Sequence, residues 1–176
     1  MNITEIRFHG PLSLVENPEV PEWMRSPHAW KGGIYLWTIP LNDGYLINYV
    51  GQSGCFEQEH PNNVEYELTC RGACVDPDGF ILGKRNIILP HPEMTVRREW
   101  ARRIVTAYRG FIAPFDGYKP DRERIEYAVL RHLLHGERRY SSFLANKKYH
   151  KPHHSPVPLK ILCDSTLLGL PHTLEA

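Results

Sequence analysis

Two short runs of strand-forming residues, separated by a turn signal, constrain the fold of this chain more than any other feature. Residues 34–39 and 45–50 are rich in β-branched and aromatic side chains, and the link at residues 42–44 is Asn-Asp-Gly. This pattern predicts a β-hairpin. Pairing would bring Tyr35 and Tyr49 to the end away from the turn, where their hydroxyls can converge. The plain alternative is an ordinary hairpin with tyrosines at its edge.

Composition places the chain among globular proteins. It has 176 residues, 41% of them hydrophobic and 23% charged, which is enough for one domain with a core. No apolar run approaches membrane-spanning length, and residues 1–10 lack the pattern of a signal peptide. Four cysteines are few for this length, so we expect a reducing, cytoplasmic location rather than a disulfide framework.

The charge is distributed unevenly, although the formal net charge is only +1. Residues 1–94 hold 6 Lys and Arg against 12 Asp and Glu, whereas residues 95–160 hold 15 against 6. A half this basic can present a face that binds phosphates. Alternatively, the two halves neutralise each other across a shared core.

The period of the apolar residues becomes helical from Thr95 onward. Val96, Trp100 and Ile104 recur every four residues, which predicts a helix. A second helix is predicted from Lys119, with proline and an acid in its first turn, to Gly136. Asp-Pro-Asp-Gly at residues 76–79 predicts a turn.

The predicted fold class is α/β (α+β), with a small antiparallel sheet built on the hairpin and flanked by helices. We expect a single domain over residues 1–176. Its core would span residues 31–150, and residues 1–30 and 151–176 would be peripheral arms that add strands.

Glu126 is a candidate ligand for a cation. On a helix it shares a face with Val129, Leu130 and Leu133. A carboxylate on an apolar face is costly to bury unless it is paired or binds a cation. The alternative is an ion pair with Arg122, four residues earlier.

The chain contains two three-residue motifs, Gly33-Ile34-Tyr35 and Tyr49-Val50-Gly51, and the second is followed by Gln52-Ser53. Together these motifs resemble the signature of the GIY-YIG nuclease family. The resemblance covers roughly residues 31–150. It implies a metal-dependent endonuclease that hydrolyses DNA phosphodiester bonds with one Mg²⁺ or Mn²⁺ ion.

The family also implies roles for individual residues. By resemblance, Tyr35 would be the general base, Tyr49 its partner, and Glu126 the metal ligand. Asn146 falls where the family often has an asparagine after that helix, although a lone Asn in a polar loop is more often a turn residue. We expect Tyr35, Tyr49 and Glu126 to line one cleft.

One position departs from the family. An arginine usually follows the second word by about two helical turns, and here that place is held by Glu59. A carboxylate there would repel the phosphate that the arginine should bind. Either Arg71, or less favourably Arg85, replaces it, or catalysis has been lost.

The alternatives to an active nuclease are a silent nucleic-acid-binding module and a protein-interaction module that uses the acidic half. A basic face next to the cleft is expected from Arg98, Arg102, Lys147 and Lys148. The chain has no second recognisable DNA-reading motif, so specificity would come from the arms, a homodimer or a protein partner.

Overall fold

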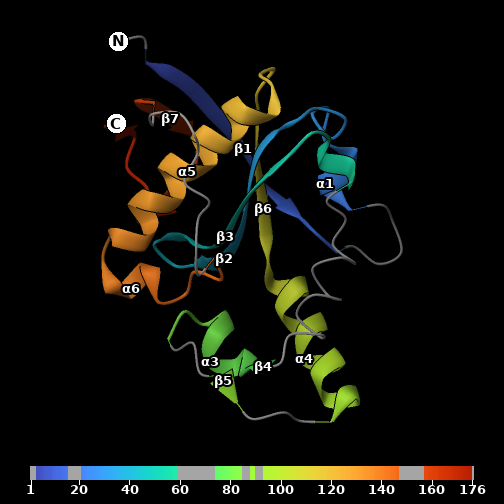
Figure 1. Ribbon diagram of the computed structural model, residues 1–176. Helices are drawn as coiled ribbons and strands as arrows, with labels where there is room; N and C mark the ends of the chain where they lie inside the picture. Colours follow the sequence, from blue (N-terminus) through green and yellow to red (C-terminus); the bar gives the residue numbers. More distant parts are fainter. Residues whose placement is uncertain are drawn as a thin grey trace.

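The computed structural model describes residues 3–15, 21–58, 74–84, 88–89, 93–146 and 157–175. Seven strands form one sheet in the order β8-β3-β2-β6-β1-β7-β9, and β4 and β5 form a separate pair (Figure 1). The strands are β1 (Thr4–Ser13), β2 (Gly33–Leu41), β3 (Gly44–Ser53), β4 (Cys74–Val75), β5 (Ile88–Leu89), β6 (Arg109–Pro114), β7 (Leu159–Cys163), β8 (Leu167–Leu168) and β9 (Thr173–Leu174). The helices are α1 (Glu22–Arg25), η1 (Phe56–Gln58), α3 (Pro77–Ile81), α4 (Met94–Ala107), α5 (Lys119–His135) and α6 (Arg138–Ser141).

The hairpin is confirmed and lies within the sheet. Strands β2 and β3 are antiparallel, with Tyr35 opposite Gly51 and Trp37 opposite Tyr49. Strand β6 pairs with the other edge of β2, also antiparallel. Because β2 has a strand on each side and helices over both faces, its first seven residues are all buried.

The sheet is larger than expected and it is mixed, so the predicted small antiparallel sheet is not confirmed. Strand β1 pairs in parallel with β7, and β3 pairs in parallel with β8. Strand β1 lies between β6 and β7, inside the sheet rather than at its margin. The partners of β1 are about a hundred or more residues away in the chain, and a local sequence pattern carries no information about such pairing.

The two long helices are confirmed, because their apolar period and start signals are strong. The predicted turn at residues 76–79 is instead the start of α3. The Asp76 carboxylate accepts a hydrogen bond from the backbone N–H of Asp78, and Pro77 occupies the first helical position. No helix in the described ranges is long and apolar enough to cross a membrane.

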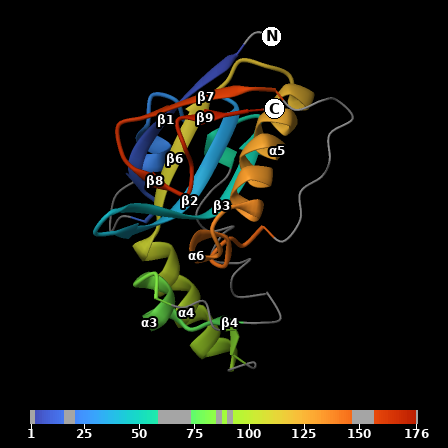
Figure 2. The same cartoon turned by 90° about the vertical axis from the view of Figure 1, so that its left-hand side faces the viewer.

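The two faces of the sheet carry different partners. One face, with Ile34, Leu36 and Val50, packs against Ile125 and Val129 of α5. The opposite face holds a second core that is rich in aromatic residues, including Tyr35 and Trp37. Figures 1 and 2 show α5 alongside the sheet, whereas α3 and α4 lie beyond one of its ends.

Candidate functional site

The two tyrosines of the hairpin come together, and Gly51 makes this possible. Tyr35 and Gly51 are opposite each other, and the Tyr35 ring lies across the glycine. A Cβ added at Gly51 would lie 2.5 Å from the Tyr35 hydroxyl oxygen. The ring centroids of Tyr35 and Tyr49 are 5.9 Å apart. Any side chain at residue 51 would therefore displace the Tyr35 ring.

Aromatic side chains surround Tyr35 on this face. The Trp37 ring centroid lies 5.3 Å from that of Tyr35, and the Trp23 centroid lies 6.0 Å away in an edge-on arrangement. The Trp23 indole N–H donates to the backbone carbonyl of Phe56 at 3.0 Å, which links α1 to η1. Tyr35 is only 6% exposed, whereas Tyr49 is half-buried. Of the two phenols, Tyr49 is thus the more accessible to solvent.

Glu126 lies in the first half of α5, on the arc that packs against the sheet. Its neighbours Val129, Leu130 and Leu133 are all buried. Burial, and secondarily the negative charge of Glu123, raise the pKa of Glu126 from 4.5 to about 7. Within the described ranges, the structure gives its carboxylate no hydrogen bond or ion pair. A half-buried carboxylate without a compensating cation is energetically unfavourable in its charged form.

Arg122 does not neutralise Glu126, although it lies one helical turn earlier. Its guanidinium donates to the backbone carbonyl of Gly117 at 2.7 Å and to the side-chain oxygen of Gln52 at 3.3 Å. The ion pair considered from the sequence is therefore absent between these two described side chains. Arg122 instead joins the start of α5 to the end of β3.

The contact between Arg122 and Gln52 was not expected from the sequence, which indicated Arg122 only as a possible partner of Glu126. Gln52 directly follows the Tyr49-Val50-Gly51 word, and its pairing with Ile34 directs its side chain to the face that α5 covers. The sequence offered one signal, the four-residue spacing between Arg122 and Glu126. That spacing predicted an ion pair and not a contact with β3.

Asn146 holds the outer edge of β3 and is not a simple turn residue. Its side-chain oxygen accepts from the Val50 N–H at 2.9 Å, and its amide donates to the Val50 carbonyl at 3.0 Å. The Ala145 N–H donates to the Asn48 carbonyl at 2.6 Å. Strand β8 covers β3 only at Tyr45 and Leu46. Asn146 and Ala145 thus satisfy backbone groups of Val50 and Asn48, on either side of Tyr49, that β8 leaves unpaired.

Strand β3 separates the tyrosines from Glu126. Side chains alternate between the two faces of a strand, so Tyr49 leaves on the aromatic face while Val50 leaves on the face covered by α5. Tyr35 also belongs to the aromatic face. The expected single cleft is therefore not formed on one face of the sheet. The two tyrosines and Glu126 lie on opposite sides of the β3 segment that is hydrogen-bonded to Asn146.

The basic candidate residues do not form one face, because they lie at opposite ends of the sheet. Arg98 and Arg102 are exposed on α4, which lies beyond one end of the sheet. The hairpin turn is at this end, where Gly83 packs on Leu41. Arg122 lies near Gln52 and Gly54, at the opposite end of the hairpin. A basic face made by α4 is thus distant along the sheet from the start of α5. Five of the candidate residues fall outside the described residues: Glu59, Arg71, Arg85, Lys147 and Lys148.

A protein cage for a metal is not found in the part of the chain that the structure describes, where no group of three or more His, Cys, Asp or Glu side chains could hold an ion. A single carboxylate suits Mg²⁺, which retains several waters and is commonly bound by one or two carboxylates together with substrate phosphate. Glu126 fits that requirement because it is half-buried and has no described partner.

Comparisons with family models, with curated proteins and with solved structures found no match for this chain. The likeness to the GIY-YIG nucleases therefore depends on its own residues. These are the two words of the hairpin, Glu126 on a downstream helix, and Asn146 after that helix.

Proposed function

We propose that this protein is a GIY-YIG-like, metal-dependent endonuclease that hydrolyses DNA phosphodiester bonds. The observation that carries the proposal is Glu126. It is a half-buried carboxylate in the middle of a helix, with a pKa of about 7 and no described cation beside it. A structural carboxylate at such a position would ordinarily be paired, whereas a metal ligand must remain available.

The order of the elements supports this proposal. The hairpin of β2 and β3 comes first, β6 lies along the other edge of β2, and α5, which carries Glu126, packs on β3 and β2. Asn146 then returns to β3 beside Tyr49. Segments far apart in sequence thus lie beside β3, with α5 on one face and the two tyrosines on the other.

Glu126 would hold the divalent ion in this proposal, and Asn146 would position the strand that carries Tyr49. A bound Mg²⁺ or Mn²⁺ stabilises the negative charge that develops on the phosphoryl oxygens. By resemblance Tyr35 would be the general base and Tyr49 its partner, but both lie on the face of the sheet opposite α5, so a water beside an ion on Glu126 would need another base.

Arg122 is a candidate for the phosphate-binding arginine that the family usually has where this chain has Glu59. Its guanidinium is half-buried at the end of the hairpin that carries the two tyrosines, and it is one helical turn from Glu126. A guanidinium can donate two parallel hydrogen bonds to phosphate oxygens. Arg71 remains the other candidate.

The second candidate function is a catalytically silent nucleic-acid-binding module. It is favoured by one observation, the burial of Tyr35 on the face opposite α5. A general base needs to reach a water molecule and its target phosphate. A scaffold whose first tyrosine is only structural would keep DNA binding without cleavage.

A nicking assay on supercoiled plasmid with Mg²⁺ or Mn²⁺ tests the proposal. The parent should nick, and Glu126→Gln should lower the rate at least about a hundredfold. Glu123→Gln is the matched control, because this exposed carboxylate lies one turn earlier on the same helix. Binding of Mn²⁺, followed by electron paramagnetic resonance, should be lost in Glu126→Gln only. Binding of DNA without nicking in any metal would establish the silent module instead.

A further inference from the structure

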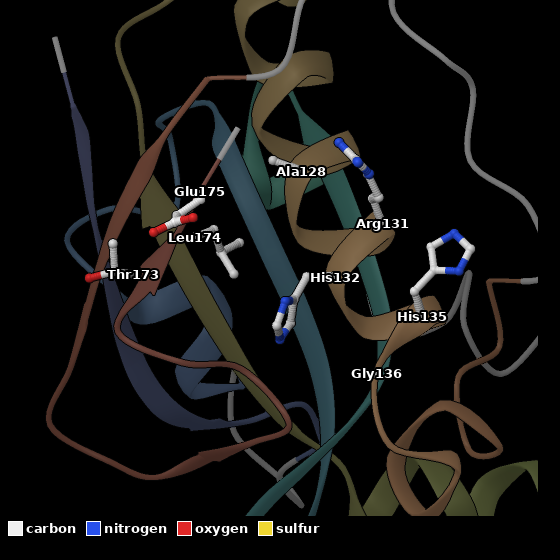
Figure 3. Close-up of a pocket in the computed structure, with 8 residues that line it drawn as sticks. All are labelled: Ala128, Arg131, His132, His135, Gly136, Thr173, Leu174 and Glu175. Atoms are coloured by element: carbon white, nitrogen blue, oxygen red, sulfur yellow. The ribbon is translucent and has the colours of Figure 1, made fainter. Parts of the chain in front are cut away.

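Histidine side chains of this protein lie singly in some places and as a pair in another. An open cavity between α5 and β9 has His132 and His135 among its lining residues. Figure 3 shows the His132 ring alone beside this cavity, whereas His135 extends from the flank of α5 turned away from β9. These two imidazoles therefore do not converge on one ligand.

The rings of His9 and His28 lie against each other. Their centroids are 4.4 Å apart and their planes are tilted by 36°. Because Phe8 of β1 is buried on the face covered by α5, the alternation of side chains places His9 on the opposite face. His28 lies in the turn after α1, the helix that packs Trp23 on Tyr35 on that same face. The pair thus joins two separate elements.

The backbone holds His28 in place over β1. The Lys31 N–H donates to the His28 carbonyl at 2.9 Å, and the His28 N–H donates to the Ser26 hydroxyl at 3.3 Å. Helix α1 is itself attached to β1, because the Ser13 N–H donates to the Glu22 carboxylate at 2.8 Å. The position of the His28 ring is therefore set by its own turn and by the helix before it.

The ring nitrogens of this pair are not satisfied by the protein. The Nδ1 atom of His28 is buried and has no hydrogen-bond partner among the residues that the structure describes. Within the same ranges, the ring nitrogens of His9 make no hydrogen bond either. A buried polar atom without a partner is unfavourable. Neutral imidazole binds metal ions through Nδ1 or Nε2, so a bound ion would satisfy such an atom.

The charges next to the pair compensate one another. Arg7 lies two residues before His9, on the same face of β1, and its guanidinium pairs with the Asp164 carboxylate at 3.4 Å. Asp164 directly follows β7, whose Cys163 is paired with Phe8. Its carboxylate therefore lies beside His9 as well, and the two groups interact electrostatically. A cation at this place is not opposed by an unpaired arginine.

The separation of the rings suits two ligands of one ion. A Zn–N distance of about 2.1 Å puts the centroids of two neighbouring imidazole ligands roughly 4.5–5 Å apart, and the observed distance is 4.4 Å. Turning one nitrogen of each ring to the ion requires a change in χ2, a torsion with a broad energy profile in histidine. No group of three or more His, Cys, Asp or Glu side chains that could hold an ion is found in the described ranges. Water would therefore fill the other coordination positions.

We propose that His9 and His28 bind one divalent transition-metal ion such as Zn²⁺ or Ni²⁺. Imidazole suits these metals, whereas Mg²⁺ prefers oxygen ligands. The ion fastens the turn after α1 to β1, and so holds in place the helix whose Trp23 covers Tyr35. The inference is independent of Glu126 and of DNA cleavage.

Thermal unfolding of the full chain at increasing Zn²⁺ concentration tests the proposal. A site built from two separate elements exists only in the folded state, so a bound ion should raise the Tm saturably. Broadening of ¹⁵N amide signals by paramagnetic Ni²⁺ locates the ion and should be strongest around His9 and His28.

Substitution of each histidine identifies the ligands. His9→Gln and His28→Gln should each lower the affinity for Zn²⁺ at least about tenfold. The double variant should lose little more than either single variant, because the two side chains hold the same ion. Each variant is compared with its own metal-free form, so that a change in basal stability does not affect the result.

Three control variants exclude binding elsewhere. His135→Gln removes an exposed histidine of α5, and Glu126→Gln removes the carboxylate proposed for Mg²⁺. A third variant replaces three histidines that lie outside the described residues by Gln: His150, His153 and His154. All three controls should keep the effect of Zn²⁺ on the Tm. Absence of a saturable rise in the parent, or a rise that survives in either His9→Gln or His28→Gln, would overturn the proposal and leave the pair as a packing contact.

Discussion

Glu126 makes the stability of the protein depend on pH in an unusual direction. Its pKa is raised from 4.5 to about 7, so between these values the folded state binds more protons than the unfolded state. Stability should fall by up to about 3 kcal/mol as the pH rises from 4.5 through 7, and then become level. Urea unfolding at several pH values measures this slope.

Glu126→Gln should flatten that slope and stabilise the protein at pH 8, because a neutral amide replaces a buried charge. Glu123→Gln should keep most of the slope. Mn²⁺ at pH 8 should raise the stability of the parent and not of Glu126→Gln. An unchanged slope in Glu126→Gln would mean that another group is responsible.

Gly51 carries a second prediction at this scale. The Tyr35 ring occupies the space that a side chain at residue 51 would need. Gly51→Ala should therefore lower the free energy of unfolding by about 2–4 kcal/mol, since overpacking forces buried groups to move. Thermal unfolding by circular dichroism measures the loss.

A double-mutant cycle shows whether the clash with Tyr35 is the cause. In the background of Tyr35→Ala, the added methyl group has room, so Gly51→Ala should cost much less. Equal losses in both backgrounds would contradict the interpretation of Gly51 as a space for Tyr35.

At the scale of secondary-structure elements, Asn146 satisfies hydrogen-bonding groups on the outer edge of β3. It satisfies both backbone groups of Val50, so Asn146→Ala should leave a donor and an acceptor unpaired. The expected loss is about 1–3 kcal/mol. Hydrogen exchange of the Val50 amide should be accelerated more than that of amides in β1.

Asn146→Asp distinguishes the two bonds. A carboxylate can still accept from the Val50 N–H, but it cannot donate to the Val50 carbonyl. Its stability should be no greater than that of Asn146→Ala, because the carboxylate repels that carbonyl. Asn42→Ala, in the exposed hairpin turn, is the control and should change stability little.

At the scale of the whole molecule, the separation of charge can be tested by DNA binding. The double substitution of Arg98 and Arg102 to Gln removes two exposed charges on α4. If α4 binds phosphates, affinity for duplex DNA should fall. The dependence of log affinity on log salt should also decrease by about 0.9 for each phosphate that is no longer neutralised. Filter binding at several salt concentrations measures both.

Arg7→Gln is the control for this experiment, because the exposed Arg7 of β1 already pairs with Asp164 at 3.4 Å. A fall in affinity that is equal in the control would point to net charge alone. Binding that does not depend on salt would argue against a nucleic-acid role for the basic half.

Local patterns in the sequence were sufficient to predict the hairpin and the two long helices. Residues 34–50 contain the strand signals and the turn together, and α5 has its start and stop signals within its own span. The sequence also indicated that Glu126 lies on an apolar face, since helical periodicity depends only on spacing. The turn assigned to residues 76–79 failed because the same residues can also cap a helix.

Tertiary structure decided what the local pattern could not. The insertion of β1 between β6 and β7 pairs segments separated by most of the chain, and the energy of that pairing is spread over the whole sheet. Glu126 and Tyr35 lie on opposite sides of the sheet because α5 packs its apolar arc on the Ile34 face. The same packing places the Arg122 guanidinium against Gln52 and not against Glu126. The sequence by itself therefore determined the hairpin, the two long helices and the apolar face that carries Glu126, while packing decided which of the candidate residues meet.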